Sequence, residues 1–104
     1  MSKGVKTSFK EVTAGKVNRE QVVELTGVFQ YNFEDVAIYS DKGDKAAALW
    51  VNFNESIDNR SDSLLHRLSG RKVRVTGKIN LLDKGHMSAY AGSMDSVFCI
   101  TEVK

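Results

Sequence analysis

Leu25-Thr26-Gly27-Val28-Phe29 carries a pattern that recurs later in the chain as Val75-Thr76-Gly77-Lys78-Ile79. In both segments an apolar residue precedes Thr-Gly, and another apolar residue follows after one intervening position. Both lie in runs where apolar and polar residues alternate, which is typical of half-buried β-strands. A glycine inside a strand is typical of a bulge or a sharp bend, and a bend lets one strand pair into both halves of a closed barrel. The repeat therefore indicates a small β-barrel, although two such short matches can also arise by chance.

The same alternation predicts a mainly β chain with one short helix. Strands are expected over residues 22–31, 36–40, 46–53 and 72–79, and the segment 87–103 is expected to hold one long strand or two pieces broken near Gly92. The helix is expected between the third and fourth strands. Ser61 is its predicted N-cap, because the hydroxyl can accept from an unpaired backbone N–H, and Gly70 suits its C-cap. The apolar stripe of this helix, expected to close one mouth of the barrel, consists of Leu64, Leu65 and Leu68.

The alternation also assigns faces to three of the strands. The inward residues of the first strand are Val23, Leu25, Gly27, Phe29 and Tyr31. The fourth strand has Val73, Val75, Gly77 and Ile79 inward, and Lys72, Arg74, Thr76 and Lys78 outward. In the third strand Leu49, Val51 and Phe53 share one face, so Trp50 is expected opposite the core among polar neighbours. The final segment is apolar on both faces, and its core face stays unassigned.

Three strands, a helix and two further strands follow one another in the order of the OB-fold, a five-stranded Greek-key barrel. The chain resembles small OB-fold domains of short, uncharacterised bacterial proteins. The residues that carry this resemblance are Val23-Glu24-Leu25-Thr26-Gly27-Val28-Phe29, Ala48-Leu49-Trp50-Val51, Val73-Arg74-Val75-Thr76-Gly77-Lys78-Ile79 and Gly85-His86-Met87. We therefore expect one OB-fold-like barrel over residues 20–104, with an N-terminal arm or short packing segment over residues 1–19. OB-folds bind single-stranded nucleic acid, oligosaccharides or proteins, so the fold by itself does not select a function.

Composition excludes several classes of protein. The 104 residues make one domain, and the net charge of +2 is too small for a globally basic protein. The single cysteine, Cys99, forbids an internal disulfide and lies in an apolar run, which favours a core residue over a reactive thiol. No apolar run is long enough to span a membrane, and the N-terminus lacks the apolar stretch of a signal peptide. We expect a soluble cytoplasmic protein, or an exported one if a leader is removed.

A nucleic-acid interface is the first candidate site. Single strands bind in basic grooves beside aromatic rings on which the bases stack. The basic candidates are Lys72, Arg74 and Lys78, and the aromatic candidates are Tyr31, Tyr39, Trp50 and Tyr90. The competing interpretation is that the cations form an ordinary solvated strand face and that the aromatic rings serve the core.

His86 is a second candidate, because its loop would join the last two strands and flank the binding face of an OB-fold. The alternative is a surface imidazole in a glycine turn. His66, His86 and Cys99 lack metal-ligand spacing to one another, so no metal is expected. No catalytic or nucleotide-binding motif occurs, so we expect no cofactor and no enzymatic activity.

These observations favour a non-enzymatic OB-fold binding module that recognises a macromolecular partner. A protein partner, with an inhibitor, immunity or assembly role, is preferred because the overall charge is balanced and strand edges can extend a partner's sheet. A homo-oligomer through an exposed strand edge is equally open. The alternative is a single-stranded nucleic-acid binder that uses the basic fourth strand and the aromatic residues.

Overall fold

The computed structural model describes residues 4–32, 35–40, 47–53, 62–84 and 89–103, with Asp62 described in its backbone alone. The described elements are β1 (Val5–Lys6), α1 (Phe9–Thr13), β2 (Val22–Asn32), β3 (Asp35–Tyr39), β4 (Leu49–Phe53), α2 (Asp62–Leu68), β5 (Lys72–Asn80) and β6 (Gly92–Glu102). The predicted helix is α2, and its predicted N-cap, Ser61, lies outside the described residues. Within the described ranges, no helix combines the length and the apolar character needed to cross a membrane.

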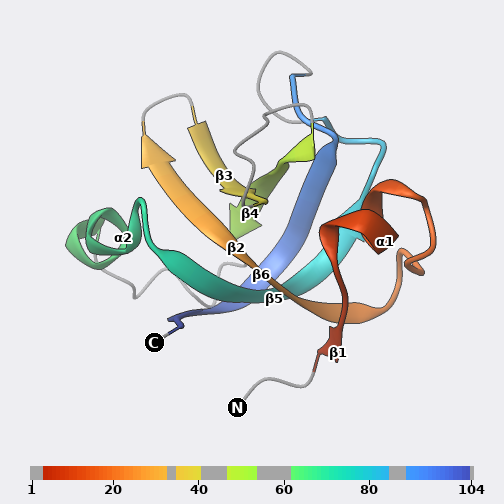
Figure 1. Ribbon diagram of the computed structural model, residues 1–104, viewed down its shortest axis with the longest axis horizontal. Coiled ribbons are helices and arrows are strands. Elements are labelled where there is room, and N and C mark those ends of the chain that lie inside the picture. Colours follow the sequence, from red (N-terminus) through yellow and green to blue (C-terminus); the bar gives the residue numbers. More distant parts are fainter. Residues whose placement is uncertain (1–3, 33–34, 41–46, 54–61, 85–88, 104) are drawn as a thin grey trace.

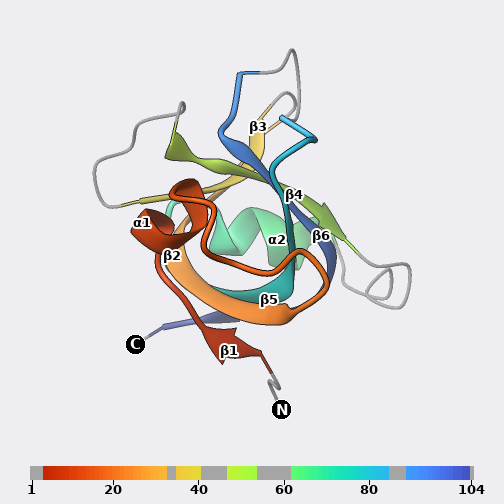
Figure 2. The ribbon, with the colours of Figure 1, turned by 90° about the vertical axis from the view of Figure 1, so that its right-hand side faces the viewer.

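Five of the described strands close into a barrel in the order β2-β3-β4-β6-β5, because β5 pairs back onto β2. The pairing of β4 with β6 is parallel, and the other four pairings of the ring are antiparallel. α2 lies between β4 and β5 in the chain and to the left of the strands in Figure 1, so Figure 2 shows it behind the ring that the strands form. The predicted class, a mainly β OB-fold-like barrel with one short helix between its third and fourth strands, is confirmed.

The glycine of the first repeat lies where β2 changes partner. β2 pairs with β5 over Val22–Val28 and with β3 over Val28–Asn32, so one bent strand serves both halves of the barrel, as predicted. A Cβ atom on Gly27 would lie 2.9 Å from the Cγ1 atom of Ile38 and would overlap the backbone oxygen of Tyr39. Only glycine therefore allows β3 to approach so closely at this bend.

The glycine of the second repeat lies opposite a bulge in β6. The register of β5 and β6 shifts so that Gly77 alone faces Ser96, Val97 and Phe98. Ser96 has a φ of 54°, in the left-handed region. A Cβ atom on Gly77 would lie 2.9 Å from the Cγ2 atom of Val97, so the glycine leaves the space that this buried valine fills. The bulge explains why no core face could be assigned from alternation: the residues that enter the core are Met94, Val97 and Ile100.

The core fills the barrel and is extended by a helix on each side. Leu65 and Leu68 of α2 are buried in it, as predicted, and Leu64 is half-buried. Val12 of α1 is completely buried in the same cluster. Figure 1 shows the two helices on opposite sides of the barrel. Phe9 and Val17 also pack against the core, so the segment before β2 contributes to it, and the predicted boundary at residue 20 stays a prediction.

One outward residue of β5 is buried. Thr76 was predicted to face outward from the barrel, and only 1% of it is exposed. β5 has a neighbour on both sides, and Thr76 lies directly between Glu24 of β2 and Cys99 of β6. Because residues of both flanking strands lie beside it, an outward position in a closed barrel is not necessarily exposed.

Candidate functional site

Three of the predicted aromatic site residues meet on the outside of the barrel. Tyr39, Trp50 and Tyr90 gather over β3 and β4, packed with Ala37 and Ala48 in a cluster separate from the main core. The rings of Trp50 and Tyr90 meet edge to face, with centroids 5.3 Å apart. We call these three residues the aromatic face. Trp50 lies opposite the core, as predicted, but the prediction of polar neighbours is wrong, because a second apolar cluster forms around it.

Asp35, at the start of β3, accepts hydrogen bonds from both tyrosine hydroxyls. The Tyr39 hydroxyl donates to the two carboxylate oxygens over 2.8 and 2.9 Å, and the Tyr90 hydroxyl donates to one of them over 2.6 Å. Tyr39 is 8% exposed and Tyr90 3%. Our reading of the sequence missed Asp35, although its separation of four residues from Tyr39 places both on one side of a strand.

The environment of the two tyrosines keeps them protonated. Burial raises the pKa of Tyr39 to about 12, and the hydrogen bond and negative charge of Asp35 act in the same direction. Burial, together with Asp35, raises the pKa of Tyr90 above its ordinary value as well. Both hydroxyls are therefore hydrogen-bond donors at neutral pH, and neither is poised as a base or a nucleophile.

Tyr31 lies apart from the aromatic face. It lies on the inward side of β2 and stacks on Phe29, with ring centroids 6.0 Å apart. Its ring also meets that of His66 in α2 edge to face, with centroids 4.8 Å apart. The structure therefore places this candidate at the junction of β2 and α2. His86, the remaining loop candidate, lies outside the described residues.

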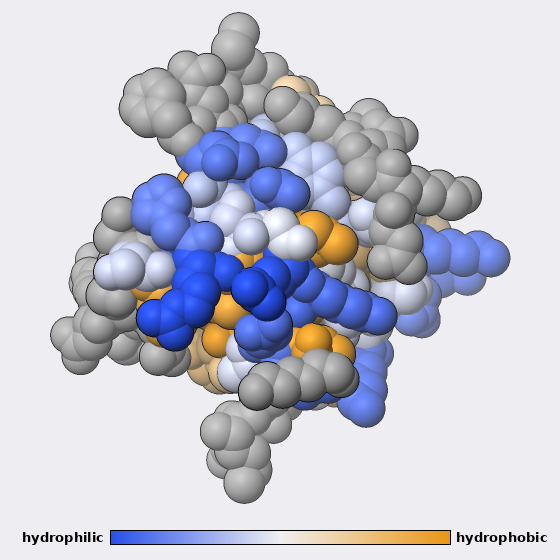
Figure 3. Space-filling view, turned by 60° about the vertical axis from the view of Figure 1, so that its left-hand side comes forward, coloured by the Kyte–Doolittle hydropathy of each residue, from blue (hydrophilic) through white to orange (hydrophobic). Residues whose placement is uncertain are grey.

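A cluster of cations occupies the junction of α2 and β5. We call it the basic face, and its members, all exposed, are Arg67, Arg71, Lys72 and Arg74. The Nε atom of Arg74 lies 3.4 Å from Oε1 of Glu24, and Nη1 of Arg71 lies 3.1 Å from Oε2 of Glu102. Figure 3, which brings forward the side of the molecule where α2 lies, shows strongly hydrophilic residues gathered beside exposed apolar ones.

Lys78, the third predicted basic residue, belongs to a different environment. It is half-buried and lies opposite Asp95 of β6. Asp95 accepts hydrogen bonds from Asn52 and Asn80 over 2.9 and 3.0 Å, and from Ser93 over 2.9 Å. Burial by itself favours the protonated acid, but these three donors and the charge of Arg19 outweigh it and hold the pKa of Asp95 below its ordinary value. This network, which joins β4, β5 and β6, was not predicted from the sequence.

The ring order separates the aromatic face from the basic face. β5 is flanked by β2 and β6, whereas the aromatic face lies over β3 and β4. One strand therefore intervenes between the two faces in either direction around the barrel. Lys72 and Arg74 therefore lie on a strand that is adjacent to neither strand of the aromatic face.

Within the part of the chain that the structure describes, no group of three or more His, Cys, Asp or Glu residues could hold a metal ion. Cys99 is half-buried on β6. No protein-family model, curated protein or solved structure matches this chain. The function must therefore be argued from the two faces themselves.

Proposed function

We propose that this barrel is a non-enzymatic binding module of the OB type whose partner is another protein. The observation that carries the proposal is the separation of the aromatic face from the basic face. A non-specific single-strand interface needs both kinds of side chain along one groove, because phosphates and bases alternate along the ligand.

The state of each face also argues against a nucleic-acid ligand. Tyr39 and Tyr90 are almost fully buried, and their hydroxyls are held by Asp35, so neither ring offers a stacking surface. Two of the cations are in contact with carboxylates, Arg71 with Glu102 and Arg74 with Glu24. Paired cations contribute less to phosphate attraction than an uncompensated basic stripe does.

The exposed residues on the paired strands β5 and β6 fit a protein partner. The bulge leaves Phe98 of β6 exposed, and the residues that follow it in β6 pair with Thr76 and Arg74 of β5. Exposed aromatic and arginine side chains on neighbouring strands are the residue types enriched where proteins bind one another. A second copy of the chain is one such partner.

Two measurements test the proposal. First, fluorescently labelled oligothymidine is titrated with the protein at low and at physiological salt, and we expect no saturable binding. Second, a protein captured from the cells that make this chain is identified, purified and titrated back by calorimetry, and we expect a saturable complex of fixed stoichiometry. Sedimentation of the protein alone distinguishes self-association from binding of a different protein.

The contrary result is oligothymidine binding that is tight at low salt and collapses as salt is raised, combined with no reconstituted protein complex. Trp50→Ala then identifies the ligand surface. A base platform at Trp50 would make the variant lose oligonucleotide affinity at an unchanged melting temperature.

A further inference from the structure

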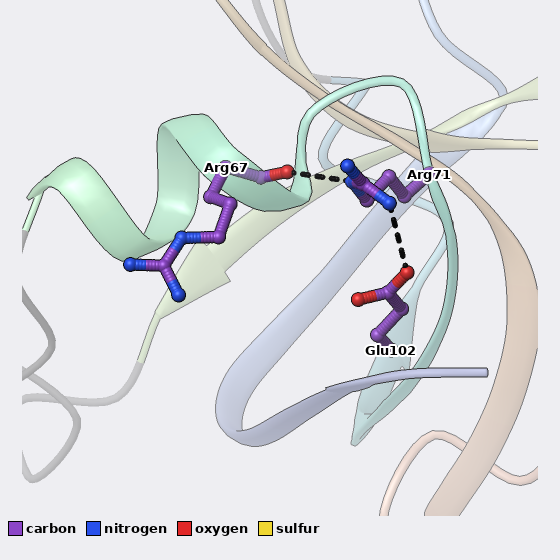
Figure 4. A network of polar contacts seen from close by, with 3 residues as sticks. All are labelled: Arg67, Arg71 and Glu102. Carbon is purple, nitrogen blue, oxygen red and sulfur yellow. Dashed lines mark hydrogen bonds and ion pairs between the residues drawn. The ribbon is translucent and has the colours of Figure 1, made fainter. Parts of the chain in front are cut away.

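We infer that the basic face docks an acidic segment of the protein partner, with Arg71 as its fixed anchor; this inference rests on the proposed function. Arg71 follows α2 and precedes β5, so it belongs to neither element, and its side chain contacts α2 and β6. Its Nε atom donates to the backbone oxygen of Arg67 over 3.1 Å, and its Nη1 atom donates to Glu102 over 3.1 Å. Figure 4 shows the guanidinium held between the end of the helix and the carboxylate.

These contacts make Arg71 a pre-organised donor. The side chain remains 55% exposed although it is held at two points. A guanidinium carries five N–H donors in a planar fork, so the two contacts leave donors directed to solvent. Because much of the side-chain freedom is already lost in the unbound protein, a carboxylate that binds here meets a smaller entropic cost than at an unrestrained arginine.

The neighbouring cations extend the site beyond one carboxylate. Arg74 is also held, by Glu24, and its side chain is 44% exposed. Lys72 lies on the same side of β5, about 7 Å away along the strand. Within the described residues, the side chains of Arg67 and Lys72 make no hydrogen bond or ion pair. The four cations outnumber the two carboxylates that contact them, so the face is complementary to an acidic surface.

The surroundings of the face favour carboxylates over a nucleic-acid strand. Across the sheet, Arg74 is flanked by Thr26 of β2 and Thr101 of β6, which offer no ring on which a base could stack. Arginine forks bind carboxylates with two parallel hydrogen bonds, and that geometry needs no stacking partner. An acidic peptide segment therefore fits the face more completely than a single strand does.

The test uses the intact protein and a fluorescein-labelled oligoglutamate peptide, titrated by anisotropy at about 50 mM and about 150 mM salt. The face variant is Arg67→Glu with Lys72→Glu. The matched control is Lys10→Glu with Lys16→Glu, which changes the net charge equally in the exposed segment around α1, across the barrel. We expect the face variant to bind the peptide at least about tenfold more weakly than the wild type, and the control to stay within about twofold.

A third variant tests whether the geometry of the Arg71 guanidinium matters in addition to its positive charge. Arg71→Lys keeps the positive charge but loses the planar fork, and we expect a loss of roughly fivefold in peptide affinity. Thermal melts of all variants confirm that each is folded. Because the exposed side chains of Arg67 and Lys72 make no hydrogen bond or ion pair with any residue that the structure describes, the face variant should melt within a few degrees of the wild type.

Several results would overturn the inference. One is the absence of peptide binding at low salt, and another is an equal loss in the control variant, which would mean general electrostatic attraction. A third is oligothymidine binding tighter than peptide binding and abolished by the face variant, which would mean a nucleic-acid ligand. If a captured protein partner binds the face variant as well as the wild type, the inference fails while the proposed function stands.

Discussion

Side chains of the aromatic face and of the basic face are both held by carboxylates, but the held side chains differ in their exposure to solvent. Asp35 holds Tyr39 and Tyr90, which are almost fully buried. Glu102 holds Arg71, which remains more than half exposed. The hydrogen bonds to Asp35 therefore lie within a buried cluster, whereas those of Arg71 hold a guanidinium that stays exposed to solvent. The difference shows that residue type alone does not tell whether a side chain held by a carboxylate is buried or exposed.

Two residues of the aromatic face, Tyr39 and Tyr90, are buried, and Tyr90 comes from a segment distant in the sequence. Tyr90 lies 55 residues from Asp35 in the sequence and reaches it through a 2.6 Å hydrogen bond. Next to it, the backbone N–H of Ala91 donates to the oxygen of Ala48 just before β4. The connection between β5 and β6 is thereby attached to β3 and β4. The basic face has no comparable cover among the described residues.

Replacing the shared acceptor should produce the largest effect. Asp35→Ala removes the charged partner of two buried hydroxyls, and we expect the free energy of unfolding to fall by about 3 kcal/mol. Urea denaturation measures it. Glu102→Ala on the basic face is the matched control and should cost less than about 1 kcal/mol. Equal losses in the two variants would contradict the distinction between the faces.

The second-largest effect is expected from alkaline pH, which should lower the free energy of unfolding through Tyr39. The pKa of Tyr39 is raised to about 12 in the folded protein from 10.0, so the folded state holds this proton more tightly than the unfolded state does. The resulting stability is complete below pH 10 and is lost as the pH rises towards 12, by about 2 kcal/mol. Denaturation at a series of pH values measures this slope, and Tyr39→Phe should reduce it. A slope unchanged by that substitution would mean that Tyr39 titrates normally.

Removing one hydroxyl should have a smaller effect. Tyr90→Phe keeps the ring against Trp50 but deletes the hydrogen bond to Asp35, and we expect a loss of about 1.5 kcal/mol. Because Tyr39 and Tyr90 share one acceptor, the double variant with Tyr39→Phe should depart from the sum of the single effects, which a double-mutant cycle measures. Strict additivity would show that the two hydroxyls act independently.

The smallest effect is expected on the basic face. Arg74 and Glu24 are 3.4 Å apart, and the arginine side chain is 44% exposed. Solvent screens such a pair, so Arg74→Ala should lower the free energy of unfolding by about 0.5 kcal/mol, and by less when salt is added. Chemical denaturation at two salt concentrations measures it. A loss as large as that of Tyr90→Phe would give this pair a structural role.

The strands were predictable where the alternation is regular and each strand keeps one register. β2 and β5 bury Val23, Leu25, Val73 and Val75, which the alternation predicted to face inward. The same local reading could not assign β6, because the bulge at Ser96 shifts the period, and a bulge is visible only when two strands are paired. The short β1 strand was not predicted for a related reason, since its pairing with β2 defines it.

The candidate residues were predictable by type but not by grouping. The alternation of apolar and polar residues along a strand predicted that Arg74 and Trp50 face outward. It could not predict which residues lie beside them, because that depends on the order of strands around the barrel. This order brings Tyr39, Trp50 and Tyr90 together and keeps Arg74 away from them. The hydrogen bond from Tyr90 to Asp35 could not be predicted either, because these residues lie 55 positions apart in the sequence.

The amino-acid sequence alone therefore determined the barrel, its closing helix and the inward faces of its two Thr-Gly strands, because alternation and helix capping act between near neighbours. Tertiary structure alone decided the burial of Thr76, the outward turn of Phe98, the Asp35 hydrogen bonds and the exposure of Arg71. Each of these depends on which distant strand or helix lies beside the residue, and burial is a property of that neighbourhood.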